Sequence, residues 1–239
     1  MTATGGAVPP LAVVTGAGRG LGRCLVRELD RLGHRTVCVV RDPVDAVRLA
    51  TRGENVRPVV GDVRDPAVGP DVAEIVGDDA LHLLVHNAGV AHPPRTLAQL
   101  GPDDVLDSFL THCLGPLRLT QALLPALGRA PRATVVHVSS RRGSFAVAEK
   151  DDGPGARHYA YRIGKAAQNM LSLSLHQEFA ASGIRVLAVH PGALRGAMGA
   201  PDARDEPATA AAELVRLVLT EPWRRLPPFV ERAGDPHPW

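Results

Sequence analysis

A tyrosine and a lysine stand four residues apart, a spacing that could support acid–base chemistry. On a helix, Tyr161 and Lys165 would project from the same face. The chain has two tyrosines, and Lys150 and Lys165 are its two lysines, so chance is a poor explanation of the pair. A neighbouring cation favours the phenolate and lowers the tyrosine pKa, which is ordinarily about 10. We predict that Tyr161 transfers a proton and that Lys165 tunes it; a packed Tyr161 beside a solvated Lys165 is the alternative.

Glycines at the end of an apolar run could bind the phosphates of a nucleotide. Residues 15–22 read Thr-Gly-Ala-Gly-Arg-Gly-Leu-Gly and lie between an expected strand and an expected helix. Backbone amides in such a turn can approach a pyrophosphate, and the positive end of the helix stabilises the anion. A glycine turn without a ligand is the alternative, which this position disfavours. The candidate cofactor residues here are Gly16, Arg19, Gly20, Leu21 and Gly22.

Apolar runs at intervals predict the elements that would hold these residues. Near-continuous runs of valine and leucine are typical of strands buried on both faces of a parallel sheet. Between them, segments such as 20–32 and 103–127 repeat apolar residues at helical spacing. The alternation predicts an α/β fold, a single-domain Rossmann-type doubly wound parallel sheet of about seven strands with helices on both faces. The expected strands are Leu11–Thr15, Thr36–Val40, Val56–Val60, Leu81–His86, Ala133–Val138 and Ile184–His190.

Length and composition disfavour several functions. The 239 residues, 45% of them hydrophobic, suit one domain over residues 1–239. A net charge of +2 without long basic blocks disfavours nucleic acid as a partner. Cys24, Cys38 and Cys113 form no CxxC, and the histidines lack ligand spacing, so we expect neither a disulfide framework nor a metal site. Without a long apolar run or signal-peptide features, the sequence predicts a cytoplasmic protein that does not bind membranes.

Residues at other expected strand ends complete a family pattern. Asp62-Val63 follows the third strand, Asn87-Ala88-Gly89 the fourth, Ser139-Ser140 the fifth and Pro191-Gly192 the sixth. Together with the glycine turn and the Tyr161–Lys165 pair, they resemble the short-chain dehydrogenase/reductase superfamily. Residues 139–144, 159–170, 190–199 and 229–239 are similar to its C-factor and sniffer-type carbonyl reductase branch. The likeness extends over about residues 11–239.

The resemblance implies a reaction and a role for each residue. It implies an NADPH-dependent oxidoreductase that reduces a ketone or aldehyde to an alcohol, with Tyr161 as proton donor. Ser140 would hydrogen-bond the substrate oxygen, with Ser139 as the fallback, and Lys165 would also bind the nicotinamide ribose. The family pattern adds cofactor contacts at Asp62, Val63, Asn87, Ala88, Gly89, Pro191 and Gly192.

The residues at the end of the second expected strand indicate which dinucleotide binds. An acidic residue there would bind the ribose 2′-hydroxyl of NAD, whereas arginine accommodates the 2′-phosphate of NADP. Val40 occupies the usual acid position and Arg41 follows it, with Arg19 as a second phosphate partner. We therefore predict NADP(H) in preference to NAD(H). The alternative is that both arginines are solvated and that Asp42 turns inward.

Three positions depart from the family pattern. His112 stands where an asparagine supports a proton-relay water, and it could either keep a relay or simply pack. Gly164 replaces a serine, and Gly196 a threonine that commonly touches the cofactor. These losses motivate a second hypothesis, a non-redox biosynthetic enzyme or a nucleotide-binding signalling protein on the same fold.

Two segments are expected to border the substrate site, and two helices are expected to contribute to an oligomer interface. Residues 146–158 are predicted to form an exposed loop bordering the substrate entrance, and residues 192–207 a candidate substrate lid or an ordinary surface loop. The resemblance implies that helices at 103–127 and 159–181 could form a homodimer or homotetramer. The substrate itself is expected to be a small-molecule carbonyl compound.

Overall fold

The computed structural model describes residues 8–150, 158–196, 198, 203–220 and 226–239. Its core is a single sheet of seven strands, and each pair of neighbouring strands runs parallel. The predicted fold class is therefore confirmed. Six strands lie where the apolar runs place them, β2 starting one residue earlier than expected. The strands are β1 (Leu11–Thr15), β2 (Arg35–Val40), β3 (Val56–Val60), β4 (Leu81–His86), β5 (Ala133–Val138), β6 (Ile184–His190) and β7 (Phe229–Glu231).

The strand order places a crevice at the centre of the sheet. The order is β3-β2-β1-β4-β5-β6-β7, so the chain builds outward from β1 in one direction and then returns to build from β4 in the other. In such sheets ligands bind outside the carboxyl ends of the strands, where the order reverses. Here that point lies between β1 and β4.

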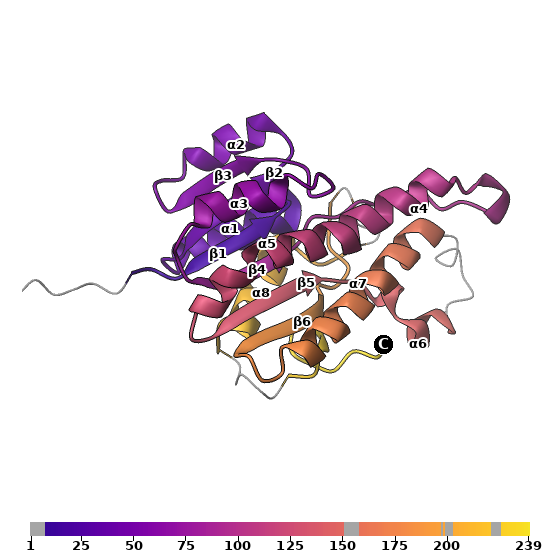
Figure 1. Ribbon diagram of the computed structural model, residues 1–239. Coiled ribbons are helices and arrows are strands. Elements are labelled where there is room, and N and C mark those ends of the chain that lie inside the picture. The colour runs from indigo at the N-terminus through magenta and orange to yellow at the C-terminus, as the bar shows by residue number, and fades with distance from the viewer. Residues whose placement is uncertain (1–7, 151–157, 197, 199–202, 221–225) are drawn as a thin grey trace, which may run out of the picture.

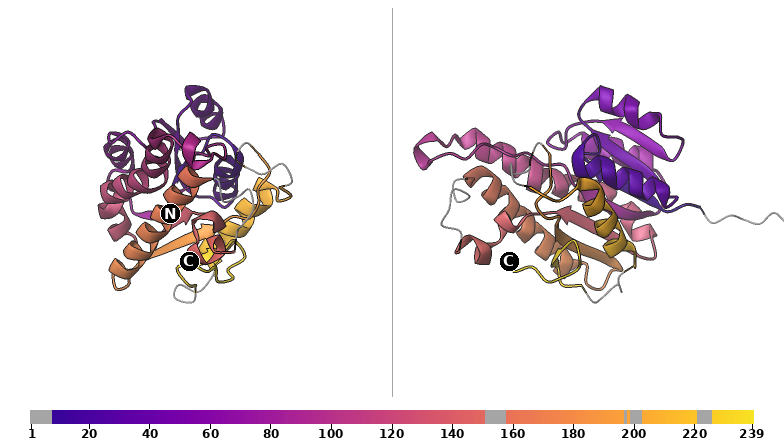
Figure 2. Two further views of the ribbon diagram at one scale, coloured as in Figure 1. Left: turned by 90° about the vertical axis from the view of Figure 1, so that its right-hand side faces the viewer. Right: turned by 180° about the vertical axis from the view of Figure 1, so that it is seen from behind.

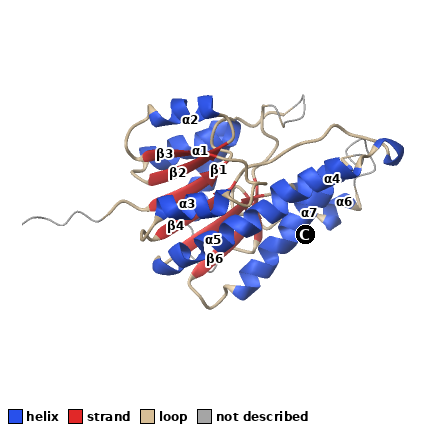
Figure 3. Cartoon of the chain, turned by 45° about the horizontal axis from the view of Figure 1, so that its top comes forward, coloured by secondary structure: helices blue, strands red, loops and turns tan. Residues whose placement is uncertain are grey.

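Helices cover both faces of the sheet and bury two apolar cores (Figures 1 and 3). On one face pack α3 (Val68–Val76), α5 (Gly115–Arg129) and α7 (Tyr159–Glu178). On the other pack α1 (Gly20–Arg31) and α8 (Pro207–Thr220), which Figure 2 shows from behind, with α2 (Pro43–Ala50) near the edge. No helix in the described ranges has the length and hydropathy that a membrane span requires.

The predicted helix at 103–127 is one continuous run with a π-helical turn inside it. It consists of α4 (Pro102–Phe109), the π turn η2 (Leu110–Leu114) and α5. α4 packs along α7 beyond the end of the sheet (Figure 1). A π turn widens the helix locally and often marks a functional site. This one contains His112.

The segment predicted as a loop from residue 146 is partly helical. α6 (Phe145–Ala148) begins one residue earlier, because the Ser144 hydroxyl accepts from the Val147 amide at 3.1 Å and caps the turn. Residues 151–157 of the predicted loop lie outside the described residues. Two short 3-10 turns, η1 (Leu97–Gln99) and η3 (Arg141–Gly143), complete the described elements.

Candidate active site

A cleft of about 1170 Å³ opens at the carboxyl ends of the strands. It lies where the strand order reverses, as the topology requires. Of the predicted site residues, His112 alone does not line it. Those that do are Gly16, Arg19, Gly20, Leu21, Gly22, Arg41, Asp62, Val63, Asn87, Ala88, Gly89, Ser140, Tyr161, Lys165, Pro191 and Gly192.

The glycine turn has the backbone geometry of an anion site. Gly16 and Gly20 have φ angles of 65° and 52°, which other residues rarely adopt. A Cβ on Gly22 would lie 2.1 Å from the Gly16 carbonyl oxygen, so a side chain there would force the turn apart. The first turn of α1 contains no acidic residue and its N-cap, Arg19, makes no side-chain cap, so the amides at this helix end have no capping acceptor. A pyrophosphate fits these donors.

Asn87 and Thr15 fix the turn to the neighbouring strand. The Asn87 side-chain nitrogen donates to the Thr15 carbonyl at 2.9 Å and to the Gly16 carbonyl at 3.2 Å. The Thr15 hydroxyl accepts from the amides of Asn87 and Ala88, both at 3.0 Å. Asn87 therefore holds the ends of β1 and β4 together from within the cleft wall.

Tyr161 and Lys165 share one face of α7, as their spacing predicts. The Lys165 Nζ lies 5.8 Å from the centre of the Tyr161 ring. It is buried and donates to the Val138 carbonyl at 2.7 Å and to the Gln168 Oε1 at 2.9 Å. Because an ammonium has three donors, one remains for a ligand in the cleft.

The electrostatics of this pair differ from the expectation. Burial raises the pKa of the Tyr161 phenol, while a hydrogen bond with Ser140 and the charge of Arg142 act in the opposite direction. Burial lowers the pKa of Lys165 to about 7. The predicted lowering of the Tyr161 pKa by Lys165 is therefore not seen; the nearby cation that favours the phenolate is Arg142.

The two serines after β5 face different partners. The buried Ser139 hydroxyl donates to the side-chain oxygen of Asn169 on α7. The Ser140 hydroxyl accepts from the Arg142 amide at 3.2 Å and hydrogen-bonds the Tyr161 phenol, so its proton lies beside the phenol oxygen and can turn to a substrate oxygen bound there. Ser140, the first choice from the sequence, is thus the serine better placed to donate to a substrate oxygen.

His112 lies behind Tyr161, with both ring nitrogens engaged. The Val90 amide donates to Nε2 at 3.3 Å, so Nδ1 carries the proton and contacts the Ser108 hydroxyl at 3.1 Å. Burial, together with the Lys165 charge, holds the His112 pKa well below its usual range. The ring meets Tyr161 edge-on, with centres 5.4 Å apart. Of the two readings of His112, this geometry favours packing against Tyr161.

The family of this chain follows from a comparison of its sequence with a family model. The model of the short-chain dehydrogenase family matches residues 10–207. This chain belongs to that family.

Relatives and solved structures agree with this assignment. The short-chain dehydrogenase described here is 34% identical over 157 residues to C-signal of Myxococcus xanthus, covering 66% of this chain and 92% of that protein. The carbonyl reductase Sniffer of D. melanogaster superposes with a TM-score of 0.86 at 26% identity, over 98% of this chain and all of the other. An NADPH-bound carbonyl reductase from chicken fatty liver gives the same values. The protein is thus an NAD(P)-dependent oxidoreductase.

Packing explains why this dehydrogenase has a glycine at position 164. A Cβ there would lie 2.3 Å from the Ser108 hydroxyl, 2.9 Å from the Ser108 carbonyl oxygen and 3.0 Å from the His112 Nδ1. The larger ring of His112 and the close approach of α4 to α7 fill the space that a serine would occupy. The departures at 112 and 164 therefore belong together.

Gly164→Ala should destabilise the dehydrogenase by about 1–3 kcal/mol, because the added methyl overpacks the contact between α4 and α7. Urea unfolding of wild type and variant measures this loss. Gly128→Ala is the matched control, since Gly128 lies in α5 with open space around its Cβ position and alanine favours a helix. Equal stabilities for Gly164→Ala and wild type would contradict the packing explanation.

The end of the cleft beside the tip of β2 carries charges of both signs. Arg19 and Arg41 are exposed and line the cleft, and the Asp42 carboxylate accepts from the Val44 amide at 2.8 Å, capping α2. Asp42 is thus engaged in its own helix cap. Sequence reasoning missed Asp45, whose carboxylate packs on the glycine turn: a Cβ on Gly18 would lie 2.3 Å from its Oδ2. No spacing rule could have placed α2 against that turn.

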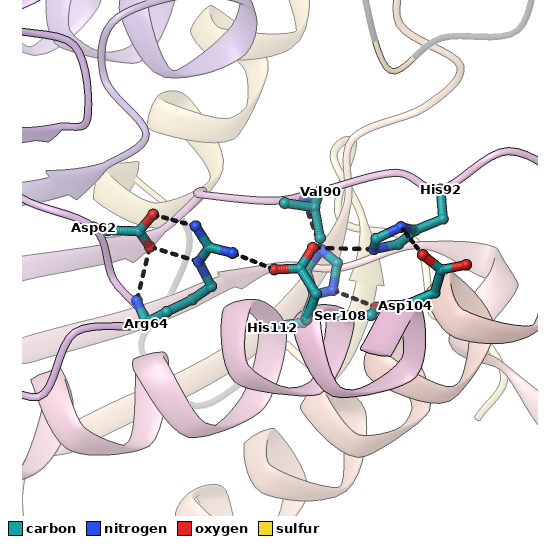
Figure 4. Close-up of polar contacts among 8 residues, drawn as sticks. Asp62, Arg64, Val90, His92, Asp104, Ser108 and His112 are labelled. Carbon is teal, nitrogen blue, oxygen red and sulfur yellow. Dashed lines mark hydrogen bonds and ion pairs between the residues drawn. The ribbon is translucent and has the colours of Figure 1, made fainter. Parts of the chain in front are cut away.

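Asp62 begins a chain of polar contacts that ends at His92 on the loop after β4 (Figure 4). The Arg64 guanidinium donates to both Asp62 carboxylate oxygens, at 3.0 and 2.7 Å, and also forms an ion pair with Asp107 on α4. Asp107 lies 3.1 Å from the His92 Nε2, and Asp104 lies 3.3 Å from its Nδ1. Arg64 holds the pKa of Asp62 below its usual range. The network ties Asp62, a predicted cofactor contact, to α4, which carries Ser108, the partner of His112.

Pro191 and Gly192 border the other end of the cleft and are fixed from the C-terminal part of the chain. The Arg232 guanidinium donates to the Pro191 carbonyl at 2.7 Å and pairs with Asp205 and Glu213. Gly192 has a φ of 89°, and a Cβ there would meet Arg232 at 1.8 Å. Arg232 follows β7, the strand that the sequence did not locate.

The candidate lid is described at its two ends. The Arg195 amide donates to the Asp205 carbonyl at 2.9 Å, and the Asp205 amide to the Ala193 carbonyl at 3.1 Å. Gly196 lines the cleft with a φ of 134°. Residues 197 and 199–202 of the predicted lid lie outside the described residues.

Proposed function

We propose that this dehydrogenase reduces a ketone or aldehyde to an alcohol with NADPH, using Tyr161 as proton donor. The observation that carries the proposal is the convergence of Ser140, Tyr161 and Lys165 at one end of a cleft whose other end is the glycine turn. The similarity to carbonyl reductases, one of them NADPH-bound, supports the same reaction.

Some of the cleft residues would bind the cofactor, and others would bind the substrate and transfer the proton. The amides of the glycine turn and of α1 would hold the pyrophosphate, and the free donor of Lys165 would reach a nicotinamide ribose hydroxyl. When bound, the reduced dinucleotide supplies the hydride. Ser140 donates to the substrate carbonyl oxygen and orients it beside Tyr161.

Tyr161 completes the reduction by giving its proton to the substrate oxygen, which becomes a hydroxyl. The raised pKa of Tyr161 keeps the phenol protonated at neutral pH, as a proton donor requires. The Arg142 charge and the Ser140 hydrogen bond then stabilise the phenolate that remains. His112 holds the ring edge-on and acts as a positioning residue.

Turnover of NADPH tests the function directly. Purified protein with saturating NADPH is mixed with a panel of aldehydes, ketones and quinones, and loss of absorbance at the nicotinamide band is followed. The proposal predicts oxidation of NADPH with at least one carbonyl class. Tight binding of NADPH without turnover across the panel would instead favour the non-redox or signalling hypothesis.

The preference for NADPH rests on Arg41. Arg41→Gln should weaken NADPH binding about tenfold, the equivalent of one charge-assisted hydrogen bond, and leave NADH binding within about twofold. Asp45→Asn should strengthen NADPH binding, because it removes a negative charge near the glycine turn. Isothermal titration with each cofactor measures both effects.

Arg27→Gln is the matched control for Arg41, because Arg27 is exposed on α1 and does not line the cleft. Wild-type protein that binds NADH as tightly as NADPH, or an Arg41→Gln variant that loses both equally, would defeat the cofactor assignment.

A further inference from the structure

Two consecutive arginines follow the Ser140 position and line the same cleft. Arg141 and Arg142 form the turn η3 with Gly143. Arg141 is exposed and Arg142 is half-buried. Both follow Ser140 directly and line the cleft together with Tyr161 and His190. In agreement with this position, the Arg142 charge acts on Tyr161 and the Arg141 charge acts on His190.

The backbone fixes this turn against the reacting residues. The Ser140 hydroxyl accepts from the Arg142 amide at 3.2 Å. Gly143 packs directly on α7, since a Cβ there would lie 2.7 Å from the Lys165 carbonyl carbon. The base of the Arg142 side chain is therefore held by Ser140 on one side and by the Lys165 backbone on the other.

The arginines have no acidic partner in the described part of the chain. Neither guanidinium forms an ion pair with a described carboxylate, whereas the cleft residue Arg195 pairs with Glu206 at 2.6 Å. Of the described residues that line the cleft, the carboxylates are Asp42, Asp45 and Asp62, which all stand beyond the ends of β2 and β3, at the nucleotide end. A half-buried arginine that pairs with no carboxylate of the described residues can bind an anion from solution.

We propose that the substrate is an anionic carbonyl compound, one whose carboxylate or comparable anion binds Arg142, with Arg141 adding charge at the rim. The proposal rests on the carbonyl reduction proposed above and names the class of substrate at that site. Because Arg142 lines the same cleft as Tyr161 and its amide is bonded to Ser140, the anion and the reacting carbonyl belong to the same small molecule. The anion is bound and not altered in the reaction.

Matched acid and ester substrates test this directly. The probes are 3- and 4-formylbenzoate and their methyl esters, which present the same aldehyde with and without a negative charge. We expect wild type to favour the acids over the esters by about tenfold or more in kcat/KM, and Arg142→Gln to lose that preference through KM for the acids. Raising NaCl from about 0.05 to 0.5 M should reduce the preference of wild type by screening.

Arg132→Gln is the matched control. Arg132 is exposed immediately before β5, at the opposite end of that strand from Ser140, and its loss should leave the preference unchanged. Equal kcat/KM for acids and esters in wild type would overturn the proposal. So would an Arg142→Gln variant that keeps the wild-type preference for acids, even if its kcat falls equally for both, since this would assign Arg142 to tuning Tyr161 alone.

A binding measurement separates this proposal from the reaction on which it rests. Benzoate and methyl benzoate are titrated calorimetrically into protein saturated with NADP⁺. Binding of benzoate that is lost in Arg142→Gln supports the anion site even if no carbonyl is reduced, in which case the reductase proposal alone fails. Reduction of neutral carbonyls with no benzoate binding overturns the anion site and leaves the reductase proposal standing.

Discussion

Tyr161→Phe should lower kcat for carbonyl reduction by about 10²–10⁴-fold, the range typical of a lost general acid. The phenylalanine ring keeps the edge-on contact with His112, so folding and NADPH binding should be nearly unchanged. Removal of the hydroxyl costs its hydrogen bond with Ser140, worth about 1 kcal/mol. Steady-state rates with saturating NADPH, together with a thermal melt, measure the two effects.

Tyr159→Phe provides the control for this experiment. Tyr159 is the other tyrosine of the chain, lies two residues earlier on α7 and is 38% exposed. It should keep wild-type rates. A fully active Tyr161→Phe enzyme would end the proposed mechanism, whereas an unfolded one would show that the hydroxyl is structural.

The fold could be predicted because its signal is local. Strands buried on both faces need continuous apolar residues, and the runs at β1, β2, β4, β5 and β6 are mostly apolar and buried almost throughout. The edge strand β3 is less regular, because Arg57 and Val60 are exposed. β7 could not be located in this way because it has three residues, Phe229–Glu231, and gains its place by pairing with β6. The π turn at 110–114 was likewise beyond a periodicity argument, since its sequence continues the pattern of one helix.

The cleft residues could be predicted because strand ends are sequence landmarks. Glycines, Asn87, Ser140 and Pro191 each follow an apolar run, and parallel strands bring those ends to one edge. Asp45, Arg64 and Arg232 were missed, because each reaches the site through a long side-chain contact that no spacing encodes. The lowering of the Tyr161 pKa by Lys165, which the motif led us to expect, is not seen: burial raises the Tyr161 pKa and lowers that of Lys165, and burial is not visible in a motif.

A second large effect, on the pH dependence of stability, is expected from two histidines buried beside the site. His86 and His137, on neighbouring strands β4 and β5, stack with ring centres 4.8 Å apart. The Ser172 hydroxyl donates to the Gln168 carbonyl at 2.7 Å and therefore accepts from the His137 Nδ1 at 2.9 Å. His86 contacts the Thr120 hydroxyl at 2.9 Å. Burial lowers the pKa of His137 to about 3 and that of His86 well below its usual range.

The protein should therefore lose stability as the pH falls below about 6.5. The unfolded chain protonates its histidines near pH 6.5, whereas folded His137 stays neutral down to a pKa of about 3. Between those values the unfolded state binds the additional proton, so each such histidine reduces the free energy of unfolding by about 1.4 kcal/mol per pH unit. Above pH 6.5 both states are neutral and the effect vanishes. Over two pH units, this loss of free energy of unfolding is a large fraction of a total stability of about 5–15 kcal/mol.

His137→Phe isolates this effect, because a phenylalanine ring keeps the stack with His86 and leaves Ser172 bonded to Gln168. Urea unfolding of the cofactor-free protein at pH 7.5, 6.5, 5.5 and 4.5 should show a steep decline for wild type and a shallower one for His137→Phe. At pH 4.5 carboxyls such as Asp62 and Asp205, whose pKa values are lowered by arginines in the folded state, begin to protonate in the unfolded chain. Both proteins share these carboxyls, so the difference between the two curves reports His137. His82→Gln, at the opposite end of β4 from His86 and partly exposed, should follow wild type. Parallel curves for wild type and His137→Phe would show that buried His137 is not the group that makes folding pH-dependent.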